Sequence, residues 1–339
     1  MKNVNRQKTA KKLCLMAFII LFGSLVPQHT LIAGSVTEYD QSHQQTAANS
    51  VPPADESPWN RWDLSRIQAT EAPRIASGKT GISIAILDTG IDSAHITLQG
   101  KVISSVNFTE SPVVDDLNGH GTHIAGIIAA SPNSFSGLIG LAENSQLMNV
   151  KVANDDGFCN ATTIAKGILW AVENGANVIN ISLVINKPSS ELEDAVNYAW
   201  DNGVVVVAAA GNSFNSAPTY PAFYPNTIAV AATDTNDRVP SWSNRGEWVD
   251  VAAPGVAIYS AAPKDGSAWK SGTSQAAALV SAEAALLFAI ATDANGNGKV
   301  NDEVRAAIEE GSDTMDRNGI GKGRINVLKA LEFLITPRN

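Results

Sequence analysis

Five continuous apolar segments, separated by stretches with helical periodicity, most restrict how this 339-residue chain can fold. They occupy residues 82–88, 147–152, 177–182, 204–210 and 227–233. Their apolar residues follow one another without polar alternation, which is typical of strands covered on both faces in a parallel sheet. With 44% hydrophobic residues, the chain can bury the core that such a sheet needs.

Apolar stripes of helical period mark three segments between these strands, residues 121–130, 162–175 and 190–203. The last two end at Gly175 and Gly203, which we expect to be C-terminal caps. The order strand, helix, strand predicts an α/β fold with three layers: a mainly parallel central sheet with helices on both faces, joined by right-handed crossovers. We assign this fold to one domain, residues 57–336.

The first 33 residues have the composition of a secretory signal peptide. Five positive charges come before or at the edge of an apolar run at 13–26, which is too short to cross a bilayer comfortably. We expect cleavage near Ala33, and an uncleaved membrane anchor is the alternative. Residues 34–56 are polar and contain a Pro pair, so we interpret them as a flexible leader or short propeptide. The mature protein is then expected to be secreted, either extracellular or periplasmic, without membrane attachment.

Charge and cysteine content narrow the class of protein. Removing the predicted signal takes the formal net charge from −9 to −14. Such an acidic chain argues against nucleic acid as a partner, because phosphate binding needs clustered Lys and Arg. Cys14 leaves with the signal, so Cys159 has no partner for an internal disulfide. We interpret Cys159 as a small residue in a loop or at the end of an element, not as a nucleophile.

Reactive residues are expected beyond the carboxyl ends of the strands, where helices begin. Asp88 ends the first predicted strand, where a buried charge is unfavourable unless another group pairs with it. The alternative for Asp88 is an aspartate that only caps a turn. His120 lies between two glycines in NGHGTHIAG, where glycine lets a neighbouring backbone or a substrate approach closely. A capping or core histidine is the alternative for His120.

His123 follows His120 by one helical turn and raises the question of a metal site. The HExxH pattern of zinc proteases is absent, and no carboxylate on that predicted helix has a suitable spacing. We therefore interpret His123 as a residue that packs beneath His120.

Ser274 stands at the start of another predicted helix, in SGTSQAAALV. An N-cap serine is the alternative, but it leaves Gly272 and the alanine run unexplained. Small neighbours keep the hydroxyl open to a large substrate, and the free amides of a helix N-terminus favour a developing negative charge. Asn212 follows the fourth predicted strand and can donate to an oxyanion beside Ser274, although Asn is also common in turns. Together, these residues supply a nucleophile, a base, a carboxylate that orients the base and an oxyanion donor.

Four motifs in this order give the chain a resemblance to the subtilisin-like serine proteases. They are ILDTGID around Asp88, NGHGTHIAG around His120, AAAGN ending at Asn212 and SGTSQAA around Ser274, and the resemblance covers residues 59–334. It implies that Ser274 is the nucleophile and that His120 is the general base and then the general acid. Asp88 would orient His120, and Asn212 would form the oxyanion hole with the Ser274 amide.

The same resemblance implies a polypeptide substrate, bound as an extended strand along the backbone near Ser182 and Leu183. The further substrate-binding positions that it implies are Val184, Ala209, Gly211 and Ala222. The chemistry requires no cofactor, and we expect a monomer.

The chain departs from the family's motifs at positions that bear on its chemistry. Ala278 stands where the family usually has Pro, which allows a more regular helix and can move the Ser274 hydroxyl. We hypothesise that the acyl-enzyme then passes its acyl group to amines more readily than usual. Val184 and Ile185 replace two glycines that often line the cleft, so we expect a narrower pocket. Thr97 replaces an Asp of the strong calcium site found in many relatives, which puts that site in doubt.

A second candidate for structural calcium lies at residues 293–303. This segment resembles an EF-hand loop in its first, third and fifth positions, which are Asp293, Asn295 and Asn297. The twelfth position is Val304 rather than Glu, so a polar turn that caps a helix from Asn301 is the favoured alternative.

The sequence thus predicts a secreted serine endopeptidase that hydrolyses peptide bonds through an acyl-enzyme. One alternative is a processing protease or transpeptidase of narrow specificity with the same fold, favoured by Val184, Ile185 and Ala278. The other is an inactive peptide-binding pseudoprotease, which is disfavoured because all four reactive positions are filled.

Overall fold

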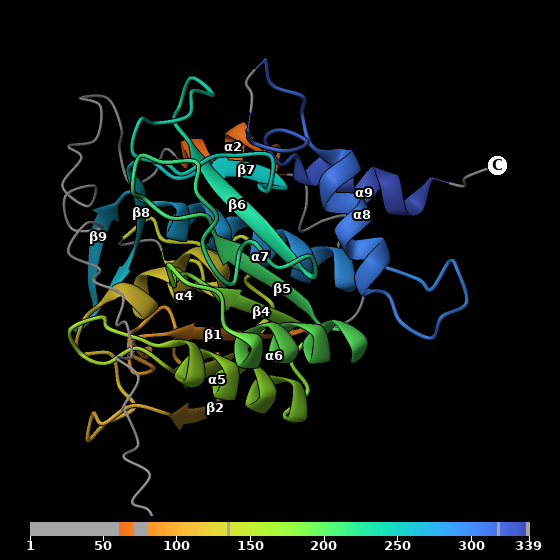
Figure 1. Cartoon of the computed structure of the whole chain (residues 1–339). Coiled ribbons are helices and arrows are strands. Elements are labelled where there is room, and N and C mark those ends of the chain that lie inside the picture. The colour runs from red at the N-terminus through yellow and green to blue at the C-terminus, as the bar shows by residue number, and fades with distance from the viewer. Residues whose placement is uncertain (1–60, 71–80, 134–135, 317–318, 337–339) are drawn as a thin grey trace, which may run out of the picture. The chain divides into compact units, whose positions relative to one another are not determined.

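A seven-stranded parallel sheet forms the centre of the computed structural model (Figure 1). The structure describes residues 61–70, 81–133, 136–316 and 319–336. The strands of the sheet are β1 (Ser83–Asp88), β2 (Val102–Asn107), β3 (Gln146–Lys151), β4 (Val178–Ile181), β5 (Val205–Ala209), β6 (Thr227–Thr233) and β7 (Val251–Pro254). Their order is β2-β3-β1-β4-β5-β6-β7, and every neighbouring pair is parallel.

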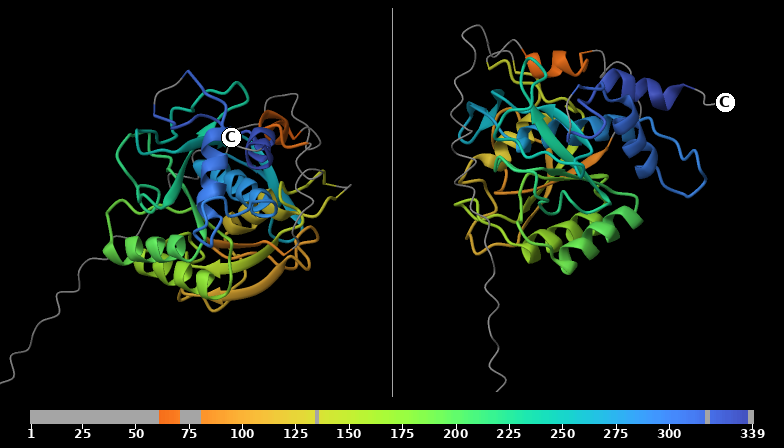
Figure 2. Two further views of the ribbon diagram at one scale, coloured as in Figure 1. Left: turned by 90° about the vertical axis from the view of Figure 1, so that its right-hand side faces the viewer. Right: turned by 45° about the horizontal axis from the view of Figure 1, so that its top comes forward.

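Helices cover both faces of this sheet, as Figures 1 and 2 show. One face packs against α4 (His120–Ala129) and α7 (Thr273–Phe288), and the other packs against α5 (Ala161–Glu173) and α6 (Ser190–Asp201). Further helices are α2 (Trp62–Arg66), α8 (Asn301–Gly311) and α9 (Val327–Ile335). In β1, Ile84 and Ile86 join the core on the α4 and α7 side, whereas Ala85 and Leu87 join the core on the other side. The three-layer α/β prediction is therefore confirmed.

The predicted strands correspond to β1, β3, β4, β5 and β6, with ends that differ by one residue at most. The predicted helices are α4, α5 and α6, with ends within two residues. Gly175 and Gly203 follow α5 and α6 in the left-handed region, with φ of +83° and +79°. This is the conformation that ends a helix most readily at glycine, so both predicted stop signals are confirmed.

Elements at the edges of the structure were not predicted. β2 is an edge strand in which half-buried and exposed side chains alternate, so it lacks a continuous apolar run. β7 forms the other edge, has four residues and ends at Pro254, a residue typical of edge strands. An antiparallel hairpin, β8 (Ile258–Ala262) and β9 (Gly266–Lys270), lies outside the main sheet and leads into α7.

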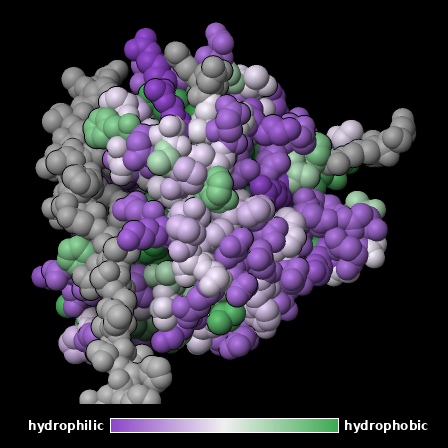
Figure 3. All heavy atoms as spheres, in the orientation of Figure 1, coloured by the Kyte–Doolittle hydropathy of each residue, from purple (hydrophilic) through white to green (hydrophobic). Residues whose placement is uncertain are grey.

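The apolar residues on the surface and the lengths of the helices relate to the prediction that the mature protein is not attached to a membrane. On the described part of the face in Figure 3, apolar residues form isolated spots among polar ones. No helix in the described segments is both long and apolar enough to cross a bilayer. The predicted signal peptide and leader, residues 1–33 and 34–56, lie outside the described residues.

Candidate active site

Asp88 and His120 meet at the carboxyl end of the sheet. Asp88 is the last residue of β1 and is fully buried, and His120 is the first residue of α4. The imidazole Nδ1–H donates to the Asp88 carboxylate, at 2.8 Å from Oδ1 and 3.0 Å from Oδ2. The opposite ring nitrogen, Nε2, is buried and has no hydrogen-bond partner among the described residues. This nitrogen can therefore accept a proton from a group placed beside it.

The close approach of β1 and α4 depends on glycine. A Cβ on Gly121 would lie 2.0 Å from the Gly90 carbonyl oxygen, so no larger residue fits between the two segments. Gly119 is the N-cap of α4 and has a φ of +92°, which favours glycine. The glycines on either side of His120 thus bring the backbone that follows Asp88 against the start of the helix.

Asp116 holds these two segments together, and its role was not predicted from the sequence. Its carboxylate is buried and accepts five hydrogen bonds, from the Thr89 hydroxyl, the amides of Asn118 and Gly119, and both the amide and the hydroxyl of Thr122. The lengths of these bonds range from 2.6 to 3.1 Å. The carboxylate therefore joins the residue after Asp88 to the turn before His120.

Ser274 is the second residue of α7, and the helix begins at the N-cap Gly272. The alternative of an N-cap serine is therefore wrong. The Ser274 hydroxyl donates to the Ser182 carbonyl at 3.3 Å, and the Ser182 hydroxyl donates to the Ser274 carbonyl at 3.1 Å. These bonds join residues 92 positions apart and place the segment after β4 beside the start of α7.

Asn212 is fixed by the residue before Ser274. Its Oδ1 accepts hydrogen bonds from the amide and the hydroxyl of Thr273, at 2.9 and 3.0 Å. Its Nδ2 is buried without a partner among the described residues, and a Cβ built on Gly272 would lie 3.3 Å from it. An amide donor is thus held next to the first turn of α7, where helix amides also lack partners. Thr273 was not predicted, since a threonine in a short motif carries no signal of this contact.

The segment that leads into Ser274 packs against the start of α4. The Lys270 ammonium, at the end of β9, donates to the Gly119 carbonyl at 2.9 Å. The Ser260 hydroxyl, from β8, donates to the His123 carbonyl at 2.7 Å. The hairpin therefore brings the residues just before Ser274 to the residue just before His120. Lys270 was not singled out by the sequence, and a lysine before SGTS is not a recognisable signal.

The residues expected to bind substrate are buried in two neighbouring segments. Ser182, Leu183 and Val184 follow β4, whereas Ala209 and Gly211 lie at the end of β5 and just beyond it. Ala222 follows Tyr220, whose backbone pairs with that of Ile185 at 2.7 and 2.9 Å. A Cβ on Gly211 would lie 3.5 Å from Cγ2 of Val184, so the Val184 side chain lies beside the backbone of Gly211. Ser182 bonds Ser274 and Gly211 bonds Thr273, so the segments after β4 and β5 both reach the start of α7, and Tyr220 joins them through its pairing with Ile185.

His123 is fully buried, and its Nε2 lies 3.0 Å from the Ala268 carbonyl oxygen. Burial lowers its pKa well below 6.5, and the Lys270 charge lowers this pKa further. In the described part of the chain, no group of three or more His, Cys, Asp or Glu side chains is arranged to hold a metal ion. These contacts agree with the interpretation of His123 as a packing residue.

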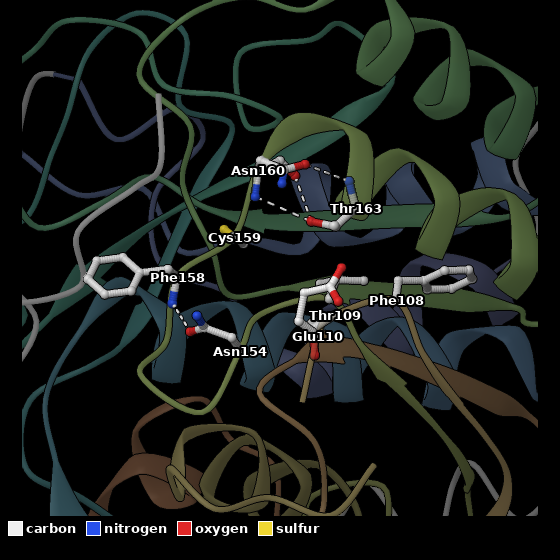
Figure 4. A pocket seen from close by; sticks show the side chains of 9 residues that line it. Phe108, Thr109, Glu110, Asn154, Phe158, Cys159, Asn160 and Thr163 are labelled. Carbon is white, nitrogen blue, oxygen red and sulfur yellow. Dashed lines mark hydrogen bonds between the residues drawn. The ribbon is translucent and has the colours of Figure 1, made fainter. Parts of the chain in front are cut away.

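Cys159 lies in the loop before α5, one of the two predicted places, and forms part of the wall of a hollow of about 160 Å³ (Figure 4). Three hydrogen bonds between Asn160 and Thr163 cap the start of the adjacent helix α5. Burial raises the pKa of the Cys159 thiol, and the charge of Asp88 raises it further. The thiol is therefore protonated at physiological pH, which agrees with its interpretation as a non-nucleophilic residue.

The two candidate calcium regions differ in their contacts. The Thr97 hydroxyl is buried beside the imidazole Nδ1 of His95, at 2.9 Å, so no carboxylate is supplied at that position. In the 293–303 loop, both Asp293 carboxylate oxygens accept backbone amides, and the side-chain oxygens of Asn295 and Asn297 do the same. The loop's own amides thus bond the oxygens that the EF-hand pattern would offer to a calcium ion, as in the polar turn before a helix that the sequence favours.

Most of the chain is similar in sequence to known proteins. The sequence model of the subtilase family matches residues 79–323, which include Asp88, His120, Asn212 and Ser274. Thermitase from Thermoactinomyces vulgaris is 45% identical over 271 residues, which cover 79% of this chain and 94% of thermitase. Subtilisin BL from Lederbergia lenta is 44% identical over 227 residues, 67% of this chain and 83% of that protein. The thermophilic serine proteinase of Bacillus sp. (strain AK1) is 43% identical over 262 residues, 76% of this chain and 64% of that longer protein.

Proposed function

We propose that Asp88, His120 and Ser274 are the catalytic triad of this chain. The premise is that the chain belongs to the subtilase family and is a serine endopeptidase of the subtilisin type. The observation that carries the proposal is the pattern of hydrogen bonds at the two ring nitrogens of His120. Asp88 holds its Nδ1 at 2.8 Å, while Nε2 has no partner among the described residues. Catalytic hydrogen bonds are often long without substrate and tighten when it binds, so Nε2 is the atom expected to engage the Ser274 hydroxyl.

In the proposed reaction, Oγ of Ser274 attacks the carbonyl carbon of a peptide bond as Nε2 of His120 takes the hydroxyl proton. The C–N bond then breaks, His120 returns the proton to the leaving amine, and water hydrolyses the resulting ester. Asp88 keeps Nδ1 protonated and stabilises the imidazolium. Nδ2 of Asn212 and the amide of Ser274 donate to the oxyanion. No cofactor takes part in this chemistry.

The proposed substrate is a polypeptide bound in extended form along the backbone of residues 182–184. Ala209, Gly211 and Ala222 would line the pocket for its side chain, with Val184 reducing the room beside Gly211. We expect this narrowing to favour small side chains before the scissile bond. A peptide library would test the expectation, because the Val184→Gly variant should accept larger side chains than the wild type.

A fluorophosphonate probe tests the triad directly. We expect it to label Ser274 in the wild type and to leave the Ser274→Ala variant unlabelled and inactive. Ser281→Ala is the matched control, because Ser281 is a buried serine of the same helix that bonds Asn180 at 2.9 Å. Labelling of a residue other than Ser274, or full proteolytic activity in Ser274→Ala, would contradict the proposal. A folded wild type that neither reacts nor cleaves peptides would support the inactive alternative.

Secretion and leader removal remain part of the proposal. The mature enzyme is expected outside the cytoplasm as a monomer, with residues 1–33 removed and residues 34–56 present or trimmed. N-terminal sequencing of the protein from a culture supernatant is expected to give a start at or beyond Gly34. Retention in the membrane with the first residues intact would instead support the uncleaved anchor.

A second candidate activity is transfer of the acyl group to an amine. The observation that favours it is the uninterrupted course of α7 from Thr273 to Phe288, through the buried Ala278. A regular first turn can place the Ser274 hydroxyl differently from a turn that contains proline. The ratio of aminolysis to hydrolysis in the wild type and in Ala278→Pro separates this activity from ordinary proteolysis.

A further inference from the structure

Lys270 places a positive charge beside Gly119, the residue that precedes the proposed base His120. It ends β9 four residues before Ser274, and its Nζ donates to the carbonyl of Gly119 at 2.9 Å. Burial lowers the pKa of Lys270, whereas the charges of Asp116 and Asp88 raise it. Among the described residues, no carboxylate lies within 4.0 Å of its Nζ. A cation without a carboxylate partner is thus held beside the residue that precedes His120.

Titratable groups near the Asp88–His120 pair in the described part of the chain include Asp92 after β1, Asp116 before α4, His123 in α4, Lys151 in β3, Asp155 in the loop after β3, and Cys159 before α5. The carboxylate of Asp92 accepts the backbone amides of Ala94 and Lys264. Lys151 is paired with Asp155 at 2.8 Å, and the Asp116 carboxylate is occupied by five hydrogen bonds. Burial keeps His123 and Cys159 uncharged at neutral pH. Lys270 is therefore the unpaired cation of this group.

We propose that Lys270 is a positioning residue whose charge disfavours protonation of His120, so that the base stays neutral and active at more acidic pH. The inference rests on the proposed role of His120 as the base. Two positive charges repel each other, and the imidazolium is the one that forms and disappears as pH changes. The bond to Gly119 keeps the ammonium at this place instead of letting it extend into solvent.

The pH dependence of kcat/KM tests the inference, because it reports the ionisation of the essential base in the free enzyme. Lys270→Met and Lys270→Gln remove the charge, and Gln can still donate to the Gly119 carbonyl. In both variants we expect the acid limb of the kcat/KM profile to shift to higher pH, by about 0.3–1 unit at low ionic strength and by less at high salt. Lys270→Arg keeps the charge and is expected to retain the wild-type limb.

Lys299→Met is the matched control, because it removes the same charge near the amino end of β5, whereas the site lies at the carboxyl ends of the strands. Lys299 lies beside Gly203, before the start of β5, with its Cγ 3.6 Å from where a Gly203 Cβ would be. An acid limb that stays in place in Lys270→Gln, or that moves equally in Lys270→Arg or Lys299→Met, overturns the inference. Fluorophosphonate labelling of Ser274 is measured in each variant as well. If the wild type is labelled but the pH profiles do not fit, only the role of Lys270 is refuted. If the wild type is not labelled, the proposed triad itself is refuted.

Discussion

Thr273 orients the side chain of Asn212 by two hydrogen bonds to its Oδ1, at 2.9 Å from the backbone amide and 3.0 Å from the hydroxyl. The same hydroxyl accepts the amide of Gly211 at 2.9 Å. Thr273 therefore joins the turn after β5 to the first turn of α7. Because Oδ1 is occupied, Nδ2 is the part of Asn212 that is available to a developing oxyanion.

Thr273→Val is expected to lower kcat by about tenfold with little change in KM, because the valine keeps the shape and the backbone amide but removes one of the two hydrogen bonds that hold the Asn212 side chain. In a subtilisin, loss of the asparagine donor itself costs about 10²–10³-fold in kcat, a measured value for that family member and not one obtained from this geometry. Thr273→Ser retains the hydroxyl and should keep most of the activity. Steady-state kinetics on a peptide substrate check this, and a rise in KM alone would contradict it.

The Asp116 carboxylate is expected to matter for both stability and turnover. Asp116→Asn replaces an acceptor oxygen with a donor that faces backbone amides, which leaves buried groups unpaired. We expect the free energy of unfolding to fall by roughly 1–3 kcal/mol and kcat to fall more than KM rises, since the start of α4 carries His120. Asp115→Asn is the control, because Asp115 is the exposed neighbour. Denaturant unfolding and kinetics would be compared, and equal effects of the two variants would refute the assignment.

The fold could be predicted because its central strands are covered on both faces. In β4 and β5 every residue is buried, so the sequence carries an unbroken apolar run that local patterns identify. The edge strand β2 has no such run, since it is partly exposed. Asp88, His120 and Ser274 could be singled out because reactive groups follow the ends of buried strands or begin helices.

The residues that support the site could not be predicted, because their contacts join distant parts of the chain. Asp116 bonds Thr89 across 27 positions, and Lys270 reaches Gly119 across 151 positions. Neither side chain stands in a pattern whose spacing implies such a contact. Polar residues such as those before His120 are common in ordinary turns, so they do not identify a carboxylate that joins two segments.

Calcium is expected to leave the unfolding temperature unchanged. In the loop that precedes α8, Asp293 Oδ1 accepts the amides of Gly296 and Asn297, at 2.7 and 3.2 Å, and Oδ2 accepts the amide of Gly298 at 2.8 Å. These bonds hold the loop without an ion. Thermal unfolding with added calcium and with a chelator checks the prediction. A calcium-dependent rise in unfolding temperature that is lost in Asp293→Asn would establish a metal site instead.

Ala278→Pro is expected to lower the ratio of aminolysis to hydrolysis by about threefold, a difference in barrier of ~0.7 kcal/mol. Proline removes the amide that α7 directs toward the Ser274 carbonyl, and that carbonyl also accepts the Ser182 hydroxyl at 3.1 Å. Ala278→Ser keeps the amide and should keep the ratio. Products formed from an activated ester in the presence of a peptide amine give the ratio, and identical values for wild type and Ala278→Pro would end the hypothesis.

Glu283 makes stability depend on pH. It is fully buried in α7, neither carboxyl oxygen has a hydrogen-bond partner among the described residues, and burial raises its pKa well above 4.5. The folded protein thus keeps a proton that the unfolded chain releases above about pH 4.5. The free energy of unfolding therefore falls as pH rises above that value, by up to about 1.4 kcal/mol per pH unit, until the folded carboxyl also ionises.

Glu283→Gln removes this dependence, because the amide has the shape of the protonated acid and does not ionise. We expect the variant to match the wild type near pH 4 and to exceed its free energy of unfolding by at least roughly 1 kcal/mol at pH 8. Both would be measured by denaturant unfolding in a Ser274→Ala background, which prevents self-digestion. Glu173→Gln, at an exposed position of α5, is the control and should show no such gain. A wild type and a Glu283→Gln variant with parallel pH profiles would mean that the carboxyl finds a partner or water that satisfies its charge.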